Sequence, residues 1–467
     1  MIHQTLTILA DWSVLDTWIV ITAAVVAMAC ALPGVYLVLR RQSMMGDALS
    51  HTALPGIVLA FLAAQWLRAA DWITPETYDA TRQGVLLLGA LLVGVLAALL
   101  TEWVQKLGHV ESSAALGVVF TTLFAAGLLL LRAEADHVDL DPDCVLYGTI
   151  ETAVIDLYGT TGIPRPAVLG AIVLGLNLLL MLVFYKELRI SAFDPALATT
   201  LGINAQAMHY ALMAVTAATV VAAFESVGSI LVIAMLIVPP ATASLLTRRL
   251  GVMIGLSLGI AALSAPLGHL MAITLPPLIF GPLGFPTVVD ASTAGGMAVA
   301  AGMLFLLAMF FAPRRGIVSR AVDQSMLSLK IASEDLLGLL YRAEEMGVET
   351  RKQTIAETLR RTLGIGPILA RAAAYKLARE GQLIAENAHY RLTPEGRDAG
   401  SRLIRSHRLW EAYLAKHMQL PPDHLHEPAE RAEHFIDREV RERLSTELDQ
   451  PQVDPHGRKI GGEEESS

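Results

Sequence analysis

The sequence predicts an all-α polytopic membrane protein that continues into a C-terminal domain outside the membrane. Hydrophobic residues make up 54% of its 467 residues and charged residues only 17%, whereas an ordinary soluble domain has about 25% charged residues. The charges are also unevenly distributed: from 17 to 312 they stand mostly in short connections, and beyond Pro313 they become dense. This composition excludes a wholly soluble protein, and the net charge of −9 describes neither part of the chain.

Nine segments are predicted to span the bilayer. Each holds about 20 mainly apolar residues, which is the length of helix that crosses the hydrocarbon core. The segments are approximately 15–39, 44–67, 84–103, 112–131, 166–185, 206–224, 227–247, 251–275 and 293–312.

The distribution of Lys and Arg predicts the orientation of these segments. Every second connection is basic, and basic connections stay in the cytoplasm. We therefore expect a protein of the cytoplasmic membrane with its N-terminus outside and its C-terminal domain in the cytoplasm. The opposite connections, 68–83 and 132–165, are acidic outer loops that either gather cations or are simply solvated. The basic residues are Arg40, Arg41, Lys106, Lys186, Arg189, Arg248, Arg249, Arg314, Arg315 and Arg320.

An acid and an imidazole interrupt the second segment. Asp47 and His51 are four residues apart and share one face of a helix. A charged side chain at membrane depth costs roughly 2.5–3.5 kcal/mol on insertion scales, so it normally faces a bundle interior or a water-filled path. One oxygen and one nitrogen ligand suit a divalent transition metal. The alternative is that Asp47 caps the helix beside Arg40 and Arg41, which leaves His51 unexplained.

Prolines interrupt the later segments at two places. Pro239 and Pro240 are expected to break the seventh segment, either as a kink or as the start of a short surface helix, ATASLLTRRLG, on which a cytoplasmic motor would dock. Backbone groups freed by such a break need partners in protein or water. LPPLIFGPLGFP (275–286) is predicted to be an outer loop. His269 is interpreted as a packed core histidine, with a place in the transport path as the alternative.

Beyond Arg315 the pattern becomes that of a soluble domain. Segments 334–346 and 354–363 alternate apolar and charged positions at helical spacing. Residues 353–381 predict a helix, a turn at 363–366 and a second helix with Pro367 in its first turn. A small strand or wing is predicted at 385–391, which completes a winged helix-turn-helix. The expected domains are a transmembrane domain (1–315), a linker (316–329), a cytoplasmic domain (330–460) and a disordered tail (461–467).

Histidines and acids in the cytoplasmic domain have the spacing of ligands on helices. His407 and Glu411 are four apart, as are His426 and Glu430. Glu433 and His434 fall three and four residues after Glu430, so these three share a face. Convergent nitrogen and oxygen ligands for a metal are therefore geometrically possible. The alternative for each residue is a solvated helix surface.

The membrane part resembles the permease subunits of bacterial manganese, zinc and iron ABC importers. The resemblance covers about 15–315 and rests on LRRQSMMGDALSHTALPGI (39–57), FDPALATTLGI (193–203) and ESVGSILVIAMLIVPPATASLLTRR (225–249), in this order. It implies a type II ABC importer fold, and it implies that Asp47 and His51 coordinate the metal in the translocation path. The segment after the prolines corresponds to the family's ATPase-coupling helix, whose expected contacts are Ala241, Thr242, Ser244, Leu245, Arg248 and Arg249.

The same resemblance implies partners for the chain. These are two ABC ATP-binding subunits, an extracytoplasmic metal-binding protein, and a second permease that is either another copy or a sister permease. The sequence contains no GxxxxGK[ST] phosphate loop, so we expect ATP hydrolysis in a separate subunit and no enzymatic activity here. It also contains no HExxH, which disfavours a membrane metalloprotease.

The C-terminal part resembles the diphtheria-toxin-repressor and manganese-repressor family of metal sensors, over roughly 330–460. The resemblance is carried by LTPEG (392–396), SHRLWEAYL (406–414), HLHEPAERAEHFI (424–436) and DPHG (454–457). A glutamate at 430 in place of cysteine goes with manganese over iron in this family, and carboxylate oxygens suit Mn²⁺. Matched by motif, the family's metal ligands fall on Asp335, His407, Glu411, His426, Glu430, Glu433 and His434.

This chain departs from the sensor pattern at two places. The manganese sensors carry another acid one turn after Asp335, where this chain has Gly338, so a two-metal cluster would lose a bridging carboxylate. The expected recognition helix, 366–381, has small apolar residues where a DNA reader usually carries polar ones. Phosphate contacts remain possible for Arg371, Lys376 and Arg379, but such contacts position a protein without specifying sequence.

These observations favour a permease subunit of an ATP-driven importer of a divalent metal ion, with Mn²⁺ favoured and Zn²⁺ or Fe²⁺ as alternatives. Its cytoplasmic domain is expected to sense the metal and to feed back on transport. The alternative function is a membrane-tethered, metal-dependent transcription regulator. A third possibility is that the tail is a relic without metal affinity.

Overall fold

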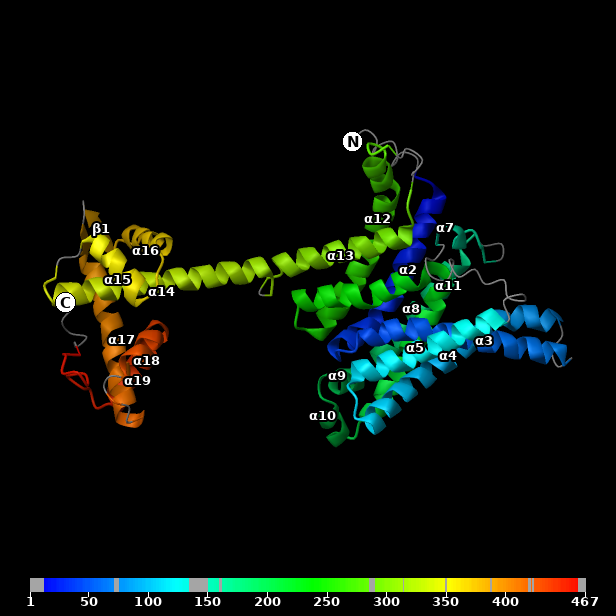
Figure 1. Ribbon diagram of the computed structural model, residues 1–467, viewed down its shortest axis with the longest axis horizontal. Helices are drawn as coiled ribbons and strands as arrows, with labels where there is room; N and C mark the ends of the chain where they lie inside the picture. Colours follow the sequence, from blue (N-terminus) through cyan, green and yellow to red (C-terminus); the bar gives the residue numbers. More distant parts are fainter. Residues whose placement is uncertain are drawn as a thin grey trace. The chain divides into compact units, whose positions relative to one another are not determined.

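The protein forms two compact units, Met1–Ser319 and Arg320–Ser467. The computed structural model describes residues 12–70, 75–133, 150–158, 162–284, 290–313, 315–348, 351–386, 389–418, 421 and 424–460 (Figure 1). The predicted disordered tail, 461–467, lies outside the described residues.

The first unit is a bundle of apolar helices. Among the described residues, eight helices or helix halves are long and apolar enough to cross a membrane. The predicted second segment is helical as α3 (Met44–Ala69), but its described apolar stretch is the shorter Pro55–Arg68. The eight are α2 (Val14–Leu39), α4 (Pro75–Gly108), α5 (Ser112–Ala133), α8 (Arg165–Val183), both halves of α11 (Ala205–Leu246), α12 (Leu250–Phe280) and α13 (Thr293–Phe311).

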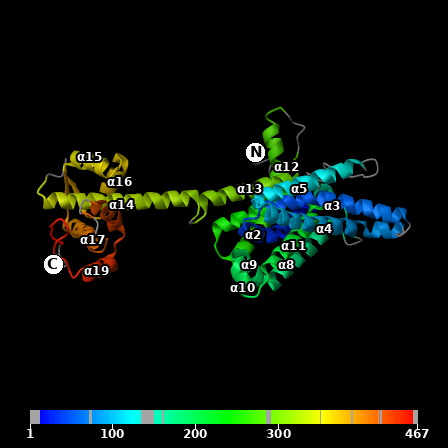
Figure 2. The same cartoon turned by 60° about the horizontal axis from the view of Figure 1, so that its bottom comes forward.

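The bundle is organised around α2, which packs against α8, α11 and α12. On another side of α11, the helices α3, α4 and α5 lie side by side (Figure 2). Leu32 and Tyr36 of α2 and Met235 of α11 are fully buried in the common core. Three short helices complete the unit: α7 (Ile150–Ala153), α9 (Tyr185–Phe193) and α10 (Pro195–Thr200).

Of the two alternatives for Pro239 and Pro240, the separate surface helix is wrong, because α11 does not end at its prolines. It continues as one helix through Pro239 and Pro240 to Leu246, so the residues after the prolines form its last turns and no separate surface helix. A proline at 240 leaves the carbonyl of Leu236 without its helical donor. That oxygen lies against α2, where a Cβ added to Gly34 would stand 1.9 Å from it. The absence of a side chain at Gly34 therefore allows α2 to approach α11 closely at this point.

The irregular point of α11 is Gly228 instead. Its φ of 74° and ψ of 165° are not helical, and this conformation is accessible essentially only to glycine. The residue lies close to the start of the second of the two stretches of α11, Ala205–Phe224 and Val227–Leu246, that are each long enough to cross a membrane.

The predicted outer loops are partly helical. α12 extends to Phe280 and includes Pro276 and Pro277, so the loop prediction for 275–286 is wrong in its first half. The helix tolerates Pro276 because the carbonyl that this proline frees, at Ala272, accepts a hydrogen bond from the amide of Ala291 at 3.0 Å. In the predicted loop 68–83, α4 already begins at Pro75.

The second unit begins with a winged helix-turn-helix, which confirms the predicted fold class. Its helices and strands are α14 (Ile317–Glu345), α15 (Lys352–Thr362), α16 (Pro367–Arg379) and the antiparallel pair β1 (Leu383–Glu386) and β2 (His389–Leu392). Leu336, Leu340 and Leu359 are almost completely buried in its core. Most of the predicted linker is helical, because α14 starts at Ile317.

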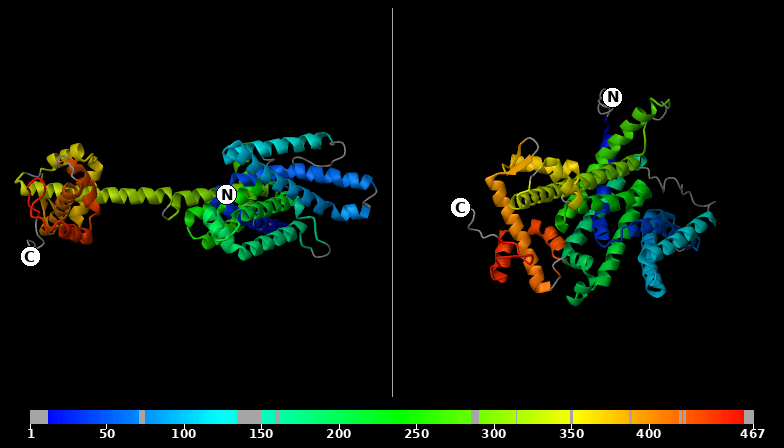
Figure 3. Two further views of the ribbon diagram at one scale, coloured as in Figure 1. Left: turned by 90° about the horizontal axis from the view of Figure 1, so that it is seen from below. Right: turned by 60° about the vertical axis from the view of Figure 1, so that its left-hand side comes forward.

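Four further elements complete the second unit: α17 (Pro394–Met418), α18 (His426–Ala432), the 3₁₀ helix η2 (Glu433–Phe435) and α19 (Arg438–Glu447). α18 and α19 both pack against α17 (Figure 3). Leu409 of α17 and Leu444 of α19 belong to a small apolar core of their own. The long helix α17 therefore carries the wing at its start and supports α18, η2 and α19 along its length.

Candidate metal sites

The predicted transport pair lies at the start of α3. Asp47 and His51 both belong to this helix, and their side chains lie outside the described part of the structure. The neighbouring residues Ala48, Leu49 and Thr52 are buried, and α3 packs against α4, α5 and α11. The pair therefore belongs to a helix inside the bundle.

The residues expected to couple to the ATPase lie at the end of α11. Thr242 is buried and bonds the carbonyl of Val238 within its own helix at 2.7 Å. The carbonyl of Ser244 accepts a hydrogen bond from Arg315 at 2.8 Å. Ala241 and Leu245 are half-buried, whereas Arg248 and Arg249 are exposed just before α12. Of the six expected contacts, the two arginines offer the most accessible side chains.

Six of the seven expected sensor ligands meet in two clusters. The first cluster, cluster A, consists of His407, Glu411 and His426. Nε2 of His407 lies 3.0 Å from Oε1 of Glu411 and 3.0 Å from Nδ1 of His426, and the last two atoms are 3.1 Å apart. His407 and Glu411 are buried on α17, and His426 begins α18 at the surface. Two nitrogens and one oxygen therefore converge on one point.

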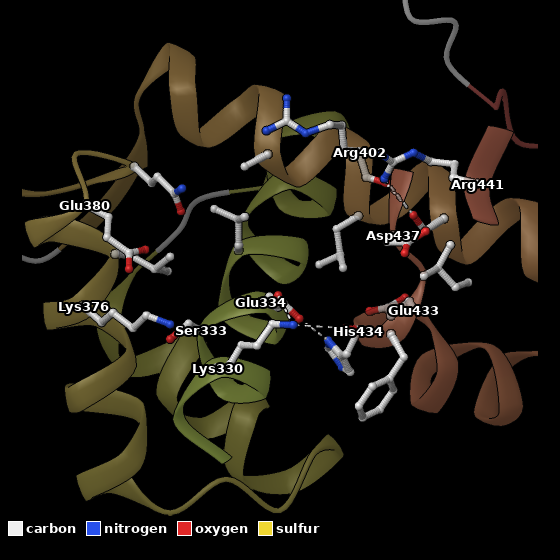
Figure 4. Close-up of a pocket in the computed structure, with 18 residues that line it drawn as sticks. Lys330, Ser333, Glu334, Lys376, Glu380, Arg402, Glu433, His434, Asp437 and Arg441 are labelled. Carbon is white, nitrogen blue, oxygen red and sulfur yellow. Dashed lines mark hydrogen bonds and ion pairs between the residues drawn. The ribbon is translucent and has the colours of Figure 1, made fainter. Parts of the chain in front are cut away.

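The second cluster, cluster B, consists of Asp335, Glu433 and His434. Nε2 of His434 lies 3.1 Å from Oδ1 of Asp335, which joins η2 to α14. Glu334, beside Asp335, contacts the other ring nitrogen of His434 at 2.8 Å. Figure 4 shows Glu334 and Lys330 beside His434, and all three residues line a cavity of about 510 Å³.

A short contact joins the two clusters. Nδ1 of His407 in cluster A lies 2.5 Å from Oε2 of Glu433 in cluster B. Both side chains are almost completely buried, at 4% exposure each. The buried side chains of His407 and Glu433 are therefore paired with each other. Such pairing is expected, because burying an unpaired charge is costly.

The two clusters shift the pKa values of their members. Burial alone lowers the pKa of a histidine, but hydrogen bonds to Asp335 and Glu334 and the charges of Asp335 and Glu433 outweigh burial and raise the pKa of His434 to about 10. Burial likewise opposes the charged form of Glu411, yet hydrogen bonds and charges from His407 and His426 lower its pKa to about 2. The pKa of His407 is also raised, because its bonds to Glu411 and Glu433 outweigh burial.

Two sequence expectations for the sensor take a different form in the structure. Glu430, the seventh expected ligand, is half-buried on α18 and belongs to neither cluster of described residues. Gly338, where the manganese sensors carry an acid, faces α17: a Cβ there would lie 3.3 Å from Leu403 and 3.6 Å from Ile404. An acid at 338 would therefore meet apolar side chains in this arrangement.

Two residues join the site that the ligand prediction did not include. Glu334 contacts His434, and the sequence offers no signal for it beyond its place next to Asp335. His456, in the DPHG motif, has Nε2 3.9 Å from Oε1 of Glu411 in cluster A. The motif itself marked this segment, although spacing could not show that it returns to α17.

The donor sets of both clusters fit a divalent metal. Imidazole nitrogens and carboxylate oxygens are ligands for Mn²⁺, Fe²⁺ and Zn²⁺. Each cluster brings three such atoms within 4.8 Å of one another, and all but His426 are largely buried. A cation in cluster B would join α14 to η2, and a cation in cluster A would join α17 to α18.

The expected DNA-binding helix, α16, exposes an apolar and basic face. Arg371 and Arg379 are exposed, and Lys376 is half-buried at the edge of the cavity next to cluster B. Between them, Ile368 is 82% and Tyr375 72% exposed. The face offers two accessible cations for phosphates, and an isoleucine and a tyrosine at the positions that point outward.

Known families match both units. Residues 15–312 match the model of the ABC 3 transport family. Residues 393–462 match the model of the iron dependent repressor, metal binding and dimerisation domain. The second match includes both helices of cluster A and the Glu433 and His434 pair of cluster B.

Individual relatives match the membrane unit. The manganese transport system membrane protein MntD of Bacillus subtilis is 39% identical over 308 residues, 65% of this chain and 95% of that protein. The zinc transport system membrane protein TroD of Treponema pallidum is 39% identical over 316 residues, 67% of this chain and 78% of that protein. The solved structure of PsaBC from Streptococcus pneumoniae in complex with Fab is similar with 28% identity and a TM-score of 0.50, covering 68% of this chain and 98% of that chain.

Proposed function

Because the chain belongs to the ABC 3 transport family, we propose that it is the permease subunit of an ATP-driven importer of a divalent metal ion, with a second unit that senses the metal. The chain is a multi-pass membrane protein, with eight long apolar helices among its described residues. The observation that carries the proposal is the family match over 15–312, which includes all of these helices and the Asp47 and His51 pair on α3.

Mn²⁺ is the proposed cargo, with Zn²⁺ and Fe²⁺ as alternatives. MntD is named for manganese and TroD for zinc, so the relatives leave the ion open. The sensor clusters favour Mn²⁺, because three of their six members are carboxylates and none of the six is a thiolate. A permease and a sensor in one chain are expected to serve the same ion.

Transport requires partners that the chain itself does not supply. We propose ATP-binding subunits that dock near Arg248 and Arg249, an extracytoplasmic metal-binding protein, and a second permease, either a copy or a sister chain. The basic connections support a docking end in the cytoplasm and an N-terminus outside. Asp47 and His51 would replace part of the hydration shell of the ion as it passes.

The second unit is proposed to report the cytosolic metal level to the permease. Without metal, hydrogen bonds and ion pairs join the elements that carry the two clusters. A bound metal ion would add coordinate bonds between these elements. Cluster B then fixes α14 to η2, and α14 is the helix that follows the last membrane span. Ordering of the sensor by metal would hold the transporter at rest when cytosolic metal is sufficient.

Uptake by a variant at Asp47 tests the transport function. Asp47→Ala removes the oxygen ligand of the pair, so Mn²⁺ uptake by cells that depend on this importer should fall to background. Metal binding by the sensor clusters should persist, because they lie in the other unit. Thr121→Ala is the matched control: its hydroxyl is exposed and bonds within α5, so uptake should be unchanged. Normal uptake by Asp47→Ala would reject the proposed ion path.

The winged helix supports a second candidate, a membrane-tethered transcription regulator. The helix-turn-helix and the wing are both formed, but α16 exposes Ile368 and Tyr375 at its surface. We expect the full-length protein with Mn²⁺ to bind DNA weakly and without sequence preference. A gel-shift series with the promoter of its own gene and scrambled DNA of equal length measures this, and a sequence-specific shift would favour the regulator.

A further inference from the structure

One buried histidine of the permease, His269, belongs neither to the transport pair nor to the sensor clusters. His269 on α12 is 2% exposed, and the sequence assigns it to the packed core. In the structure its ring lies between α13 and the first turn of α2. Nδ1 lies 3.0 Å from Oγ1 of Thr293, and Nε2 lies 3.3 Å from Oδ1 of Asp16.

The surroundings hold this imidazole in one orientation. α12 and α13 approach closely beside it, since a Cβ on Gly268 would stand 2.3 Å from the backbone of Met297. Thr293 is fixed in turn, because its backbone amide donates to Oε1 of Glu151 at 2.6 Å. The indole of Trp12 packs edge-on against the ring at 5.4 Å. A histidine whose second nitrogen is held by a polar partner in this way is typical of a metal ligand.

The carboxylate of Asp16 is fixed equally well. Its Oδ2 accepts hydrogen bonds from the amide and the hydroxyl of Ser13, both at 2.7 Å, as part of a capping box. Its other oxygen, Oδ1, is the one that faces His269. The side chain is 26% exposed, so water can reach this oxygen.

Two atoms that both carry lone pairs therefore face each other. When Nδ1 of His269 donates to Thr293, Nε2 has a lone pair, and Asp16 Oδ1 has lone pairs as well. In that tautomer a cation between the two atoms, either a metal ion or a proton, makes the arrangement favourable. Among the described residues, Nε2 makes no well-aligned hydrogen bond, although Oδ1 of Asp16 lies 3.3 Å away, so a shared proton is poorly aligned. A divalent metal suits the bent geometry, because ligands about 2.1 Å from a tetrahedral ion are roughly 3.4 Å apart.

We propose that Asp16 and His269 form a cation site of the permease for a divalent transition metal, with water completing the coordination. Thr293 is a positioning residue that orients the ring of His269. Asp16 and Arg40 are separated by 24 residues of α2, or about 36 Å of helix, and α3 with Asp47 begins just after Arg40. The new site thus lies at the opposite end of the bundle from the transport pair.

The place of this site on the transport route rests on the proposed function. With the N-terminus outside, Asp16 and His269 would be the first ligands to receive an ion delivered from outside the cell, and Asp47 and His51 would receive it later. The binding of a cation by Asp16 and His269 does not depend on that function. A binding measurement therefore tests the site by itself.

Equilibrium dialysis of the purified full-length protein against Zn²⁺ tests the proposal. Asp16→Asn and His269→Gln should each lower the bound Zn²⁺ by one equivalent per chain, whereas the other sites keep theirs. Asp16→His should restore the lost equivalent, because it supplies a new nitrogen ligand. Thr293→Val should keep the equivalent but weaken its affinity about 10- to 100-fold, the usual effect of losing the partner of a ligating histidine.

A matched control lies one turn further along α12. The hydroxyl of Thr274 bonds the carbonyl of Leu270 within its own helix at 2.6 Å, so Thr274→Val should leave the Zn²⁺ count unchanged. An unchanged count in both Asp16→Asn and His269→Gln would overturn the site and leave a plain ion pair. Failure of the transport function would appear separately, as normal uptake by Asp47→Ala.

Discussion

The expected sensor ligands illustrate how a residue pattern becomes a cluster of side chains. Spacing places His407 and Glu411 on one face of α17, and the structure adds His426 from α18 at 3.0 Å. Spacing cannot choose between adjacent acids on a helix, however. Glu334 and Asp335 both reach His434, one at each ring nitrogen, because His434 enters between them from a distant part of the chain.

The protonation of His434 predicts how metal binding depends on pH. Its pKa of about 10 in the folded protein lies above the ordinary value of 6.5. The protonated form therefore stabilises the metal-free fold below about pH 6.5, and this stabilisation is lost as the pH rises through about 10. A metal must displace that proton. Mn²⁺ affinity at cluster B should consequently rise about tenfold per pH unit between pH 6.5 and 8.5.

Electron paramagnetic resonance of free Mn²⁺ measures this dependence in the full-length protein. His434→Gln removes the titrating ring and retains a polar side chain of similar size, so the remaining Mn²⁺ binding should vary less steeply with pH. The same slope in both proteins would show that another group controls the proton release.

At the scale of elements, the membrane helices follow from hydropathy, but their irregular points do not. The sequence predicts a break at Pro239 and Pro240, whereas the helix passes through them and turns irregular at Gly228. A helix tolerates a proline more readily where the carbonyl that the proline frees finds another donor. The amide of Ala291 before α13 is such a donor for Ala272, and Gly34 on α2 allows a close helix contact at Leu236. Neither contact is visible in the local sequence.

The contact of α2 with α11 predicts the effect of a single methyl group. In Gly34→Ala, the new Cβ would stand 1.9 Å from the carbonyl oxygen of Leu236, so the two helices must separate. We expect a loss of about 1–3 kcal/mol of stability, the usual range for overpacking. The midpoint of thermal unfolding in detergent, followed by the fluorescence of a tryptophan in the bundle, measures this loss.

Gly255→Ala is the control for this substitution. No atom lies within 4 Å of a Cβ built at Gly255 on α12, and alanine is a better helix former than glycine. Its unfolding midpoint should equal or exceed that of the parent protein. Equal midpoints for Gly34→Ala and the parent would contradict the close contact of α2 with α11 at Gly34.

At the scale of the whole molecule, the sequence predicts a membrane unit and a winged-helix sensor unit, and both are formed. The reason is that each unit has its own composition: uniformly apolar helices in the first, and alternating apolar and charged positions in the second. The consequence of joining them is less visible in the sequence. α14 starts at Ile317, two residues after Arg315 bonds the end of α11, and the same helix carries Asp335 of cluster B.

This continuity predicts that metal on the sensor side controls transport. A ligand shifts a transporter between states only through its different affinity for them, and the usual coupling of 1–3 kcal/mol corresponds to a change of about 5- to 150-fold. Vesicles with the complete importer, loaded inside with graded Mn²⁺, should lose uptake by at least about fivefold as internal Mn²⁺ rises. A version that ends at Ser319 and the full-length His434→Ala variant should both keep their uptake. Because His434→Ala retains the whole second unit, it distinguishes loss of the metal site from loss of the entire unit. An equal response of all three proteins to internal Mn²⁺ would refute feedback through cluster B.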